Sequence, residues 1–224
     1  MLSNAARFLM VSAAASLVAF GAAPAEACSD LADAALDIID SGASTGNGAS
    51  FVTLAMKQAF GITGAEVRTA FGSVSPVSAQ YYWNIISENR FTHITNVNDL
   101  AAGDVLSIDA TSVYNGHSVI LLGPATQLPT PMNPIRPNTI QWSIPIADAT
   151  TAVHGCSMSY PDSRWTGACN GGTFTPGPGT AYMRLYSNLD GTLLGYSWSV
   201  TPGATYYDPA VRPYAVGRLS ACSL

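Results

Sequence analysis

Charge is scarce in this sequence, and lysine is almost missing from it. Charged residues make up 10% of the 224 residues, Lys57 is the single lysine, and the formal net charge is −5. A protein that follows nucleic-acid phosphates needs clustered lysine and arginine side chains, so we expect no nucleic-acid partner. Low charge combined with many glycine, serine, threonine and tyrosine residues is typical of an exported, turn-rich β protein.

Apolar runs of the roughly 20 residues that a membrane span needs are missing after residue 27. Before it, Arg7 precedes an apolar run from Phe8 to Gly21, and Ala25-Glu26-Ala27 has the small-x-small form that signal peptidase recognises. We therefore expect residues 1–27 to be a signal peptide that is cleaved after Ala27. The mature chain, residues 28–224, is then secreted or periplasmic, has no integral membrane span, and has the length of one domain.

Cysteine pairs with the Cys-x-x-Cys spacing of zinc sites are also missing. The chain has four cysteines, Cys28, Cys156, Cys169 and Cys222, and three histidines. This argues against a metal, and nothing in the sequence requires a cofactor. In an exported protein, oxidising conditions make disulfides the default. Of the three possible pairings we favour Cys156 with Cys169, which closes a short loop, and Cys28 with Cys222, which ties the ends of the domain together. Lipidation of Cys28 stays open.

Helical patterns come first along the mature chain, and strand patterns follow. Amphipathic and apolar patterns predict helices at 29–40, 50–60 and 75–89, and strand patterns are found at 105–109, 139–147, 181–186, 193–200 and 215–219. Two stretches rich in proline or glycine, 124–138 and 156–180, are expected to be loop insertions. This order predicts one α+β domain, with helices followed by an antiparallel sheet.

The segment from Val113 to Gly123 contains the first candidate for chemistry. His117 follows the turn-forming pair Asn115-Gly116 and opens an apolar run, which predicts a strand with a histidine at its entrance. A sheet would fix the ring there, while the adjoining loop leaves one nitrogen accessible, and this suits proton transfer. The alternative is a surface histidine that follows a hairpin turn.

Three short motifs carry a resemblance to a known family. They are a glycine-rich loop leading into an apolar helix from Asn47, Asp-Leu-Ala-Ala-Gly-Asp-Val-Leu-Ser-Ile from Asp99, and Gly-His-Ser-Val-Ile-Leu-Leu-Gly from Gly116. Over about Asn47 to Asp148 the chain resembles the NlpC-type, papain-like cysteine peptidases and amidases that cut cell-wall peptides. The resemblance implies a papain-like, NlpC-type fold of N-terminal helices followed by an antiparallel sheet.

The resemblance also implies roles for single residues. His117 matches the catalytic histidine, and Asp148, or else Gln141, matches the polar residue that orients its ring. The family's nucleophile helix begins Asp-Cys-Ser-Gly-Phe-Val, and aligning its Phe-Val with the same pair here places Gly48 where the cysteine belongs. A glycine has nothing to ionise, so thiol catalysis is impaired or lost at this position. The alternative role for Asp148 is a strand-end or turn residue bonded to its own backbone.

Cys28 offers another interpretation of the nucleophile. Cys28-Ser29-Asp30-Leu31 has the family's Cys-Ser-x-Leu spacing at the head of a helix. This would restore an active enzyme, and it would leave Cys222 without its partner.

Aromatic and charged residues near these motifs are candidates for substrate binding. Tyr82 and Trp83, in the predicted third helix, suit a groove as well as a core. His154, Arg164 and Trp165 follow Asp148 and would lie over the same end of the sheet. Arg164 suits a carboxylate of a peptide stem and Trp165 a sugar or a D-amino acid side chain. The alternative for these loop residues is to fasten the insertion beside the Cys156–Cys169 bridge.

Together these features predict an exported cell-envelope protein that resembles cell-wall peptide amidases and endopeptidases, with impaired or lost thiol catalysis. One alternative is a non-catalytic module that binds peptidoglycan-type peptides or a protein partner. Another is an active enzyme that uses Cys28. We expect a monomer.

Overall fold

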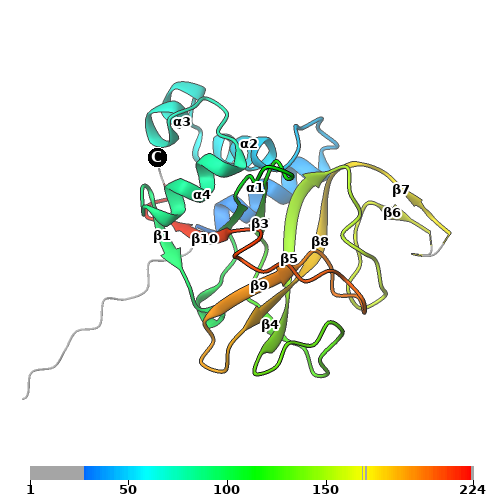
Figure 1. Ribbon diagram of the computed structural model, residues 1–224. Helices are drawn as coiled ribbons and strands as arrows, with labels where there is room; N and C mark the ends of the chain where they lie inside the picture. The colour runs from blue at the N-terminus through cyan, green and yellow to red at the C-terminus, as the bar shows by residue number, and fades with distance from the viewer. Residues whose placement is uncertain (1–27, 168, 170, 223–224) are drawn as a thin grey trace, which may run out of the picture.

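Helices precede the sheet in this chain, as the sequence patterns predict. The structure is a computed structural model that describes residues 28–167, 169 and 171–222, so the predicted signal peptide lies outside the described residues. Its helices are α1 (Ser29–Asp40), α2 (Ala49–Phe60), α3 (Gly64–Phe71), α4 (Ser78–Ile86) and the short 3-10 helix η1 (Val97–Asp99). The α-helices lie together on one side of the sheet (Figure 1). The α+β class is therefore confirmed.

The main sheet of the described residues has eight antiparallel strands. Their order is β1-β10-β2-β3-β5-β8-β9, and β4 pairs with β5 outside that path. The strands are β1 (Phe91–Ile94), β2 (Val105–Ile108), β3 (His117–Leu121), β4 (Thr126–Gln127), β5 (Ile140–Thr150), β8 (Gly177–Ser187), β9 (Leu193–Ser197) and β10 (Tyr214–Leu219). A separate hairpin of β6 (Trp165–Thr166) and β7 (Thr173–Phe174) projects beside the sheet (Figure 1).

The two faces of the sheet bury separate apolar clusters. On β3, Ile120 packs in the cluster that the helices cover, whereas Val119 and Leu121 pack in the cluster on the opposite face. Because side chains alternate along a strand, His117 shares the face of Val119. On β5, Asp148 shares the face of Ile146, which belongs to the same cluster as Val119. The sheet therefore directs His117 and Asp148 to the same face.

Several element boundaries differ from the sequence predictions. The predicted helix 75–89 is only Ser78–Ile86, while α3 and β1 were not predicted. A capping box begins α3: the Thr63 hydroxyl accepts from Glu66 N–H, and the Glu66 carboxylate accepts from Thr63 N–H at 2.7 Å. The predicted strand 139–147 continues to Thr150. The expected insertions 124–138 and 156–180 contain β4, β6, β7 and the start of β8, because short ladders satisfy part of their backbone.

Two disulfides join the pairs that were favoured from the sequence. Cys28 bonds to Cys222, which links the start of α1 to the residues after β10, and Cys156 bonds to Cys169 within the loop that carries β6. Disulfides of this kind are typical of oxidising compartments. None of the helices in the described residues is long and apolar enough to cross a membrane.

The Gly103-Asp104 turn of the second motif has a structural role. Gly103 has φ +86, and a Cβ there would lie 2.2 Å from the carbonyl oxygen of Cys28. The buried Asp104 carboxylate accepts from Ala101 N–H at 2.8 Å and from Arg218 Nε at 2.9 Å. This turn thus fixes the start of β2 against both α1 and β10.

Candidate functional site

His117 is held at the entrance of β3 by the turn before it. Gly116 has φ +77, and a Cβ there would lie 2.6 Å from the carbonyl oxygen of Ile108, so this turn requires glycine. His117 itself pairs with Ile108 of β2. Its side chain keeps 12% of its surface exposed. The predicted strand with a histidine at its entrance is therefore present.

Asp148 meets His117 across the sheet. Leu121 pairs with Ile146, and continuing this register places Asp148 diagonally opposite His117 on the same face. His117 Nε2 lies 2.7 Å from Asp148 Oδ2, and the carboxylate is fully buried. Because β5 runs on to Thr150, Asp148 lies within the strand and not at its end.

Gln141, the other candidate for orienting the imidazole, is engaged elsewhere. Its side-chain amide accepts from Met132 N–H at 2.8 Å and donates to the Met132 carbonyl at 2.7 Å. Gln141 therefore fastens the loop between β4 and β5. Of the two candidates, Asp148 is the residue that contacts His117.

Two further side chains from the segment after β5 bind the same carboxylate. His154 Nε2 lies 2.7 Å from Asp148 Oδ2, and Arg164 Nη1 lies 2.8 Å from Asp148 Oδ1. Arg164 Nε also donates to Asp162 Oδ1 at 2.8 Å. Both His154 and Arg164 are buried, so the structure uses them to complete the cluster around Asp148. Arg164 does not present a free guanidinium to a ligand.

A glycine on the neighbouring strand makes room for Arg164. Gly179 of β8 pairs with Asp148, and a Cβ at Gly179 would lie 2.7 Å from Arg164 Cγ. Only a residue without a side chain lets the arginine cross β8 at this point. Gly179 thus helps the Arg164 guanidinium to reach Asp148.

The electrostatics of the cluster fix the protonation of Asp148. Burial alone would raise its pKa, but the positive charge and hydrogen bonding of His154 and His117 outweigh burial and hold this pKa well below its usual range. A charged carboxylate only accepts hydrogen bonds, so both histidines donate from Nε2. A ring that carries its single hydrogen on Nε2 has an acceptor at Nδ1. His154 Nδ1 is buried without a partner among the described residues.

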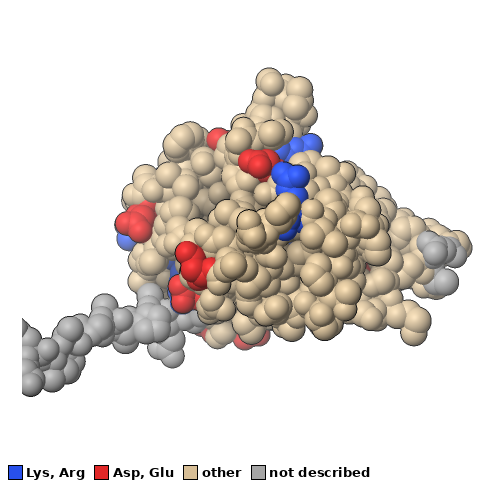
Figure 2. Space-filling model, turned by 60° about the horizontal axis from the view of Figure 1, so that its bottom comes forward, with Lys and Arg blue, Asp and Glu red and all other residues tan. Residues whose placement is uncertain are grey.

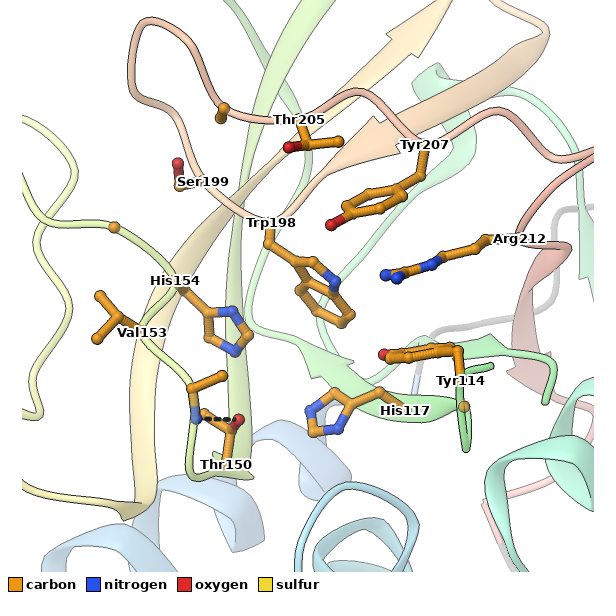
Figure 3. Close-up of a pocket in the computed structure, with 14 residues that line it drawn as sticks. Tyr114, His117, Thr150, Val153, His154, Trp198, Ser199, Thr205, Tyr207 and Arg212 are labelled. Carbon is orange, nitrogen blue, oxygen red and sulfur yellow. Dashed lines mark hydrogen bonds between the residues drawn. The ribbon is translucent and has the colours of Figure 1, made fainter. Parts of the chain in front are cut away.

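Trp198, just after β9, covers both imidazoles. Its ring stacks on His154 with centroids 4.8 Å apart and meets His117 edge-on at 5.2 Å (Figure 3). A large aromatic ring at this place limits the access of water to the Asp148 cluster and fixes the orientation of both rings.

Gly48 lies where the other nitrogen of His117 points. It is the N-cap of α2, with φ +49 and ψ −107, and its N–H donates to the Ala149 carbonyl at 2.8 Å. A Cβ at Gly48 would lie 2.8 Å from His117 Nδ1. A thiol or hydroxyl at this residue therefore has no place beside the imidazole unless the ring moves.

Cys28 is not a nucleophile in this structure. All four cysteines are bonded in disulfides, and Cys28 pairs with Cys222. A sulfur in a disulfide has no thiolate to attack a carbonyl. The interpretation of Cys28-Ser29-Asp30-Leu31 as a nucleophile motif is therefore wrong; Cys28 instead lies at the N-cap of α1.

Two adjoining pockets meet at His117. One, of about 370 Å³, is lined by residues that include Asn47, Gly48, Ser50, Ser78 and His117. The other, of about 470 Å³, is lined by residues that include Tyr114, His117, Trp198, Tyr207 and Arg212 (Figure 3). Gly116, His117 and Thr150 line both pockets. The result is a two-part cleft with the imidazole at its centre.

Sequence reasoning missed most of the second pocket, and three aromatic candidates for substrate binding lie outside both pockets. Tyr114, Trp198, Tyr207 and Arg212 match no motif, and they are brought together by the ends of β3, β9 and β10. Tyr82 and Trp83 pack edge-to-face on α4, and neither is among the residues that line the two pockets. Trp165 lines a different hollow beside Cys156 and Cys169.

His117, Asp148 and His154 are the described residues whose ligand atoms gather closely enough for a metal ion, all within 4.8 Å. In this arrangement both Nε2 atoms lie 2.7 Å from the same carboxylate oxygen, and a metal ion bound here would take the place of the Nε2 hydrogens. Arg164 already supplies positive charge to Asp148. The cluster is therefore satisfied as a hydrogen-bonded ion-pair network.

Fold and site together define an α+β protein with a buried His–Asp pair at the centre of a two-part cleft. Neither a family model nor a solved structure matches the chain. The chain is 30% identical over 179 residues to "Uncharacterized protein R653" of Acanthamoeba polyphaga mimivirus, with 75% of each chain covered. It belongs to the same protein family as this viral protein. The name of that relative states no activity.

Proposed function

We propose that this chain is an exported, NlpC-like protein of the cell envelope that binds wall-type peptides in the His117 cleft without cutting them by a thiol. The observation that carries the proposal is the contact between His117 Nδ1 and Gly48. A histidine oriented by a buried carboxylate is retained, but the position facing it holds a glycine with no space for a Cβ. The export, the envelope location and the NlpC relationship rest on the sequence motifs.

The chemistry of the cleft suits recognition of a peptide backbone. His117 Nδ1 is an acceptor that can receive a peptide N–H, because Asp148 keeps the hydrogen of the ring on Nε2. The N-terminus of α2 beside Gly48 carries the partial positive charge of a helix dipole, which suits a peptide carbonyl. Donor and acceptor therefore line the same pocket.

Charge on the surface also fits an uncharged or mildly anionic partner. Figure 2 shows a face on which acidic and basic residues are few and scattered among uncharged ones. The first pocket is lined by no acidic or basic side chain apart from His117. The part of a peptide that lies in this first pocket is thus bound chiefly by hydrogen bonds and packing, and the contribution of this pocket to affinity should depend only weakly on salt.

A second candidate function is hydrolysis by water that His117 activates directly. The intact His117–Asp148 pair favours it, since a histidine with a charged partner can accept a proton without any protein nucleophile. In such a reaction the water oxygen would form a bond to the peptide carbonyl carbon while His117 Nδ1 takes the water proton. That proton would then pass to the departing amine.

Peptide binding and peptide cleavage can be measured in one experiment. The oxidised mature protein is titrated calorimetrically with wall-type tripeptides and tetrapeptides, and the mixtures are then analysed by mass spectrometry for new amino termini. We expect saturable binding and no new termini. His117→Ala should weaken binding about tenfold, as expected for loss of one or two hydrogen bonds, whereas His93→Ala, at the histidine on β1, is the matched control and should not.

Two outcomes would contradict the proposal. New termini that disappear in His117→Ala would replace it by the water-activating enzyme. Absence of binding by any of these peptides would remove both candidate functions.

A further inference from the structure

The larger pocket of the cleft contains a cation that no acidic side chain neutralises. Its lining includes Arg212 and no aspartate or glutamate. None of the ion pairs found among the described residues involves Arg212. In a chain with a net charge of −5, an arginine inside a pocket that is in none of these ion pairs stands out as a ligand-binding group, although Tyr196 is near enough to share a hydrogen bond with it.

Two tyrosine rings fix this guanidinium. Arg212 Cζ lies 4.2 Å from the centroid of Tyr114 and 4.0 Å from the centroid of Tyr207. Figure 3 shows the guanidinium between the two rings, with its nitrogen atoms directed toward Trp198. Because both faces of the group are covered, only its N–H edge is left for hydrogen bonds. That edge points into the pocket.

We infer that Arg212 is a carboxylate-binding subsite, and that the ligand is a peptide whose free carboxylate binds Arg212 while its backbone passes over His117 toward Gly48. This inference rests on the proposed function of the cleft. A flat guanidinium edge binds a carboxylate through two parallel N–H···O bonds, which gives orientation as well as affinity. His117 lines both pockets, so the same ligand can occupy both without leaving the cleft.

The pocket also has the size and lining for the terminal residue of such a peptide. Its volume is about 470 Å³, and Trp198 gives it apolar surface beside the charged edge of Arg212 (Figure 3). Thr205 and Ser199 supply hydroxyl groups along its rim. A small side chain next to the carboxylate would lie against the Trp198 ring.

The test compares two forms of one ligand. N-acetylated trialanine is prepared with a free carboxylate and as the C-terminal amide, in L and D forms, and each is titrated into the oxidised protein. The free acid should bind about ten- to a hundredfold more tightly than the amide, as expected for hydrogen bonds to a charged group. Arg212→Gln should remove this difference between the acid and the amide.

A matched control is available on the same surface. Arg136 also packs on a tyrosine, with Cζ 4.3 Å from the centroid of Tyr206, but it does not line the pocket. Arg136→Gln should therefore keep the preference for the acid. If Arg212→Gln is poorly folded, Arg212→Met takes its place, because methionine keeps an apolar side chain between the rings. Arg212→Met should likewise remove the preference for the acid.

The possible failures of the inference can be told apart. Equal affinity of the wild-type protein for acid and amide would overturn the Arg212 subsite and leave the peptide-binding function standing. If neither peptide binds, the proposed function fails, and the subsite is tested alone by titrating N-acetylalanine while the Trp198 indole N–H is followed by NMR. A shift that Arg212→Gln removes would support the subsite; the absence of a shift would overturn it.

Discussion

The imidazole of His117 lies against the α-carbon of Gly48, in the space that a side chain at position 48 would need. A Cβ there would be 2.8 Å from Nδ1 and 3.1 Å from the ring carbon Cε1. Gly48 also has φ +49 and ψ −107, a conformation that residues with side chains rarely adopt. The backbone conformation of residue 48 and the position of the His117 ring therefore both disfavour a nucleophilic side chain here. The absence of a nucleophile does not depend on the identity of residue 48 alone.

Substitution at Gly48 should be costly for this reason. We expect Gly48→Ala and Gly48→Cys to lower the free energy of unfolding by about 2–4 kcal/mol, because backbone strain and a collision with His117 act together. Gly61→Ala is the matched control: Gly61 has φ +64 with nothing within 4 Å of its Cβ position, so strain acts alone and the loss should be about 1 kcal/mol. Urea unfolding measures all three.

Gly48→Cys should also fail to cleave peptides, since the thiol cannot take its place beside Nδ1 unless the ring moves. A Gly48→Cys protein as stable as the wild type, with an alkylatable thiol and new peptide termini, would contradict this account of the site.

The disulfides predict a simple labelling result. With Cys28–Cys222 and Cys156–Cys169 formed, the native protein should take up no iodoacetamide. After reduction in denaturant, mass spectrometry should find four labels, one for each cysteine. One reactive thiol in the native, oxidised protein would reopen the role of Cys28 as a nucleophile, provided that peptide mapping places the label there.

Stability should depend on the charge of Asp148 at acid pH. Its pKa is lower in the folded protein than in the unfolded chain, so the stabilisation is complete above the ordinary value of about 3.9 and is lost as the pH falls below it. We expect the free energy of unfolding to decline over this range. Asp148→Asn should remove that part of the decline and cost about 3–5 kcal/mol at pH 7, because Arg164 loses a buried partner.

The control for this measurement is Asp33→Asn, at an exposed aspartate on α1. This substitution removes a carboxylate from the surface. The free energy of unfolding should then decline at acid pH as it does in the wild type. An Asp148→Asn protein that keeps the full decline would assign the acid sensitivity to other groups.

Short sequence patterns predicted the His117 part of the site. The pocket that contains Arg212 is formed by contacts between residues far apart in the sequence. The Asn115-Gly116 turn and the apolar run after His117 are neighbours in sequence, so the strand and its histidine could be predicted. The resemblance to the NlpC-type family also implied roles for Asp148 and for position 48. Arg212 and Tyr114 lie 98 positions apart, and their contact depends on β10 inserting between β1 and β2, which no local pattern specifies.

The partner of Arg164 could not be predicted from the sequence for a related reason. A charged residue in a long loop suggests a ligand contact, because burial of arginine is rare unless it is paired. The pairing with Asp148 arises only when β5 and β8 lie side by side and Gly179 leaves a gap between them. The sequence around Gly179 does not indicate that the Arg164 side chain will pass over this glycine.

Gly179 therefore provides the sharpest test of how the Asp148 cluster is built. A Cβ at this position would lie 2.7 Å from Arg164 Cγ and 2.9 Å from Ser163 Oγ, so Gly179→Ala should displace the arginine and lower the free energy of unfolding by about 2–3 kcal/mol. Gly123→Ala is the matched control, because its Cβ would meet Pro145 Cγ at an ordinary 3.5 Å. The Arg164 Nε–H resonance, which reports the bond to Asp162, should shift in the first variant and not in the second. If Gly179→Ala is as stable as Gly123→Ala and leaves this resonance in place, the gap at Gly179 is not what delivers Arg164 to Asp148.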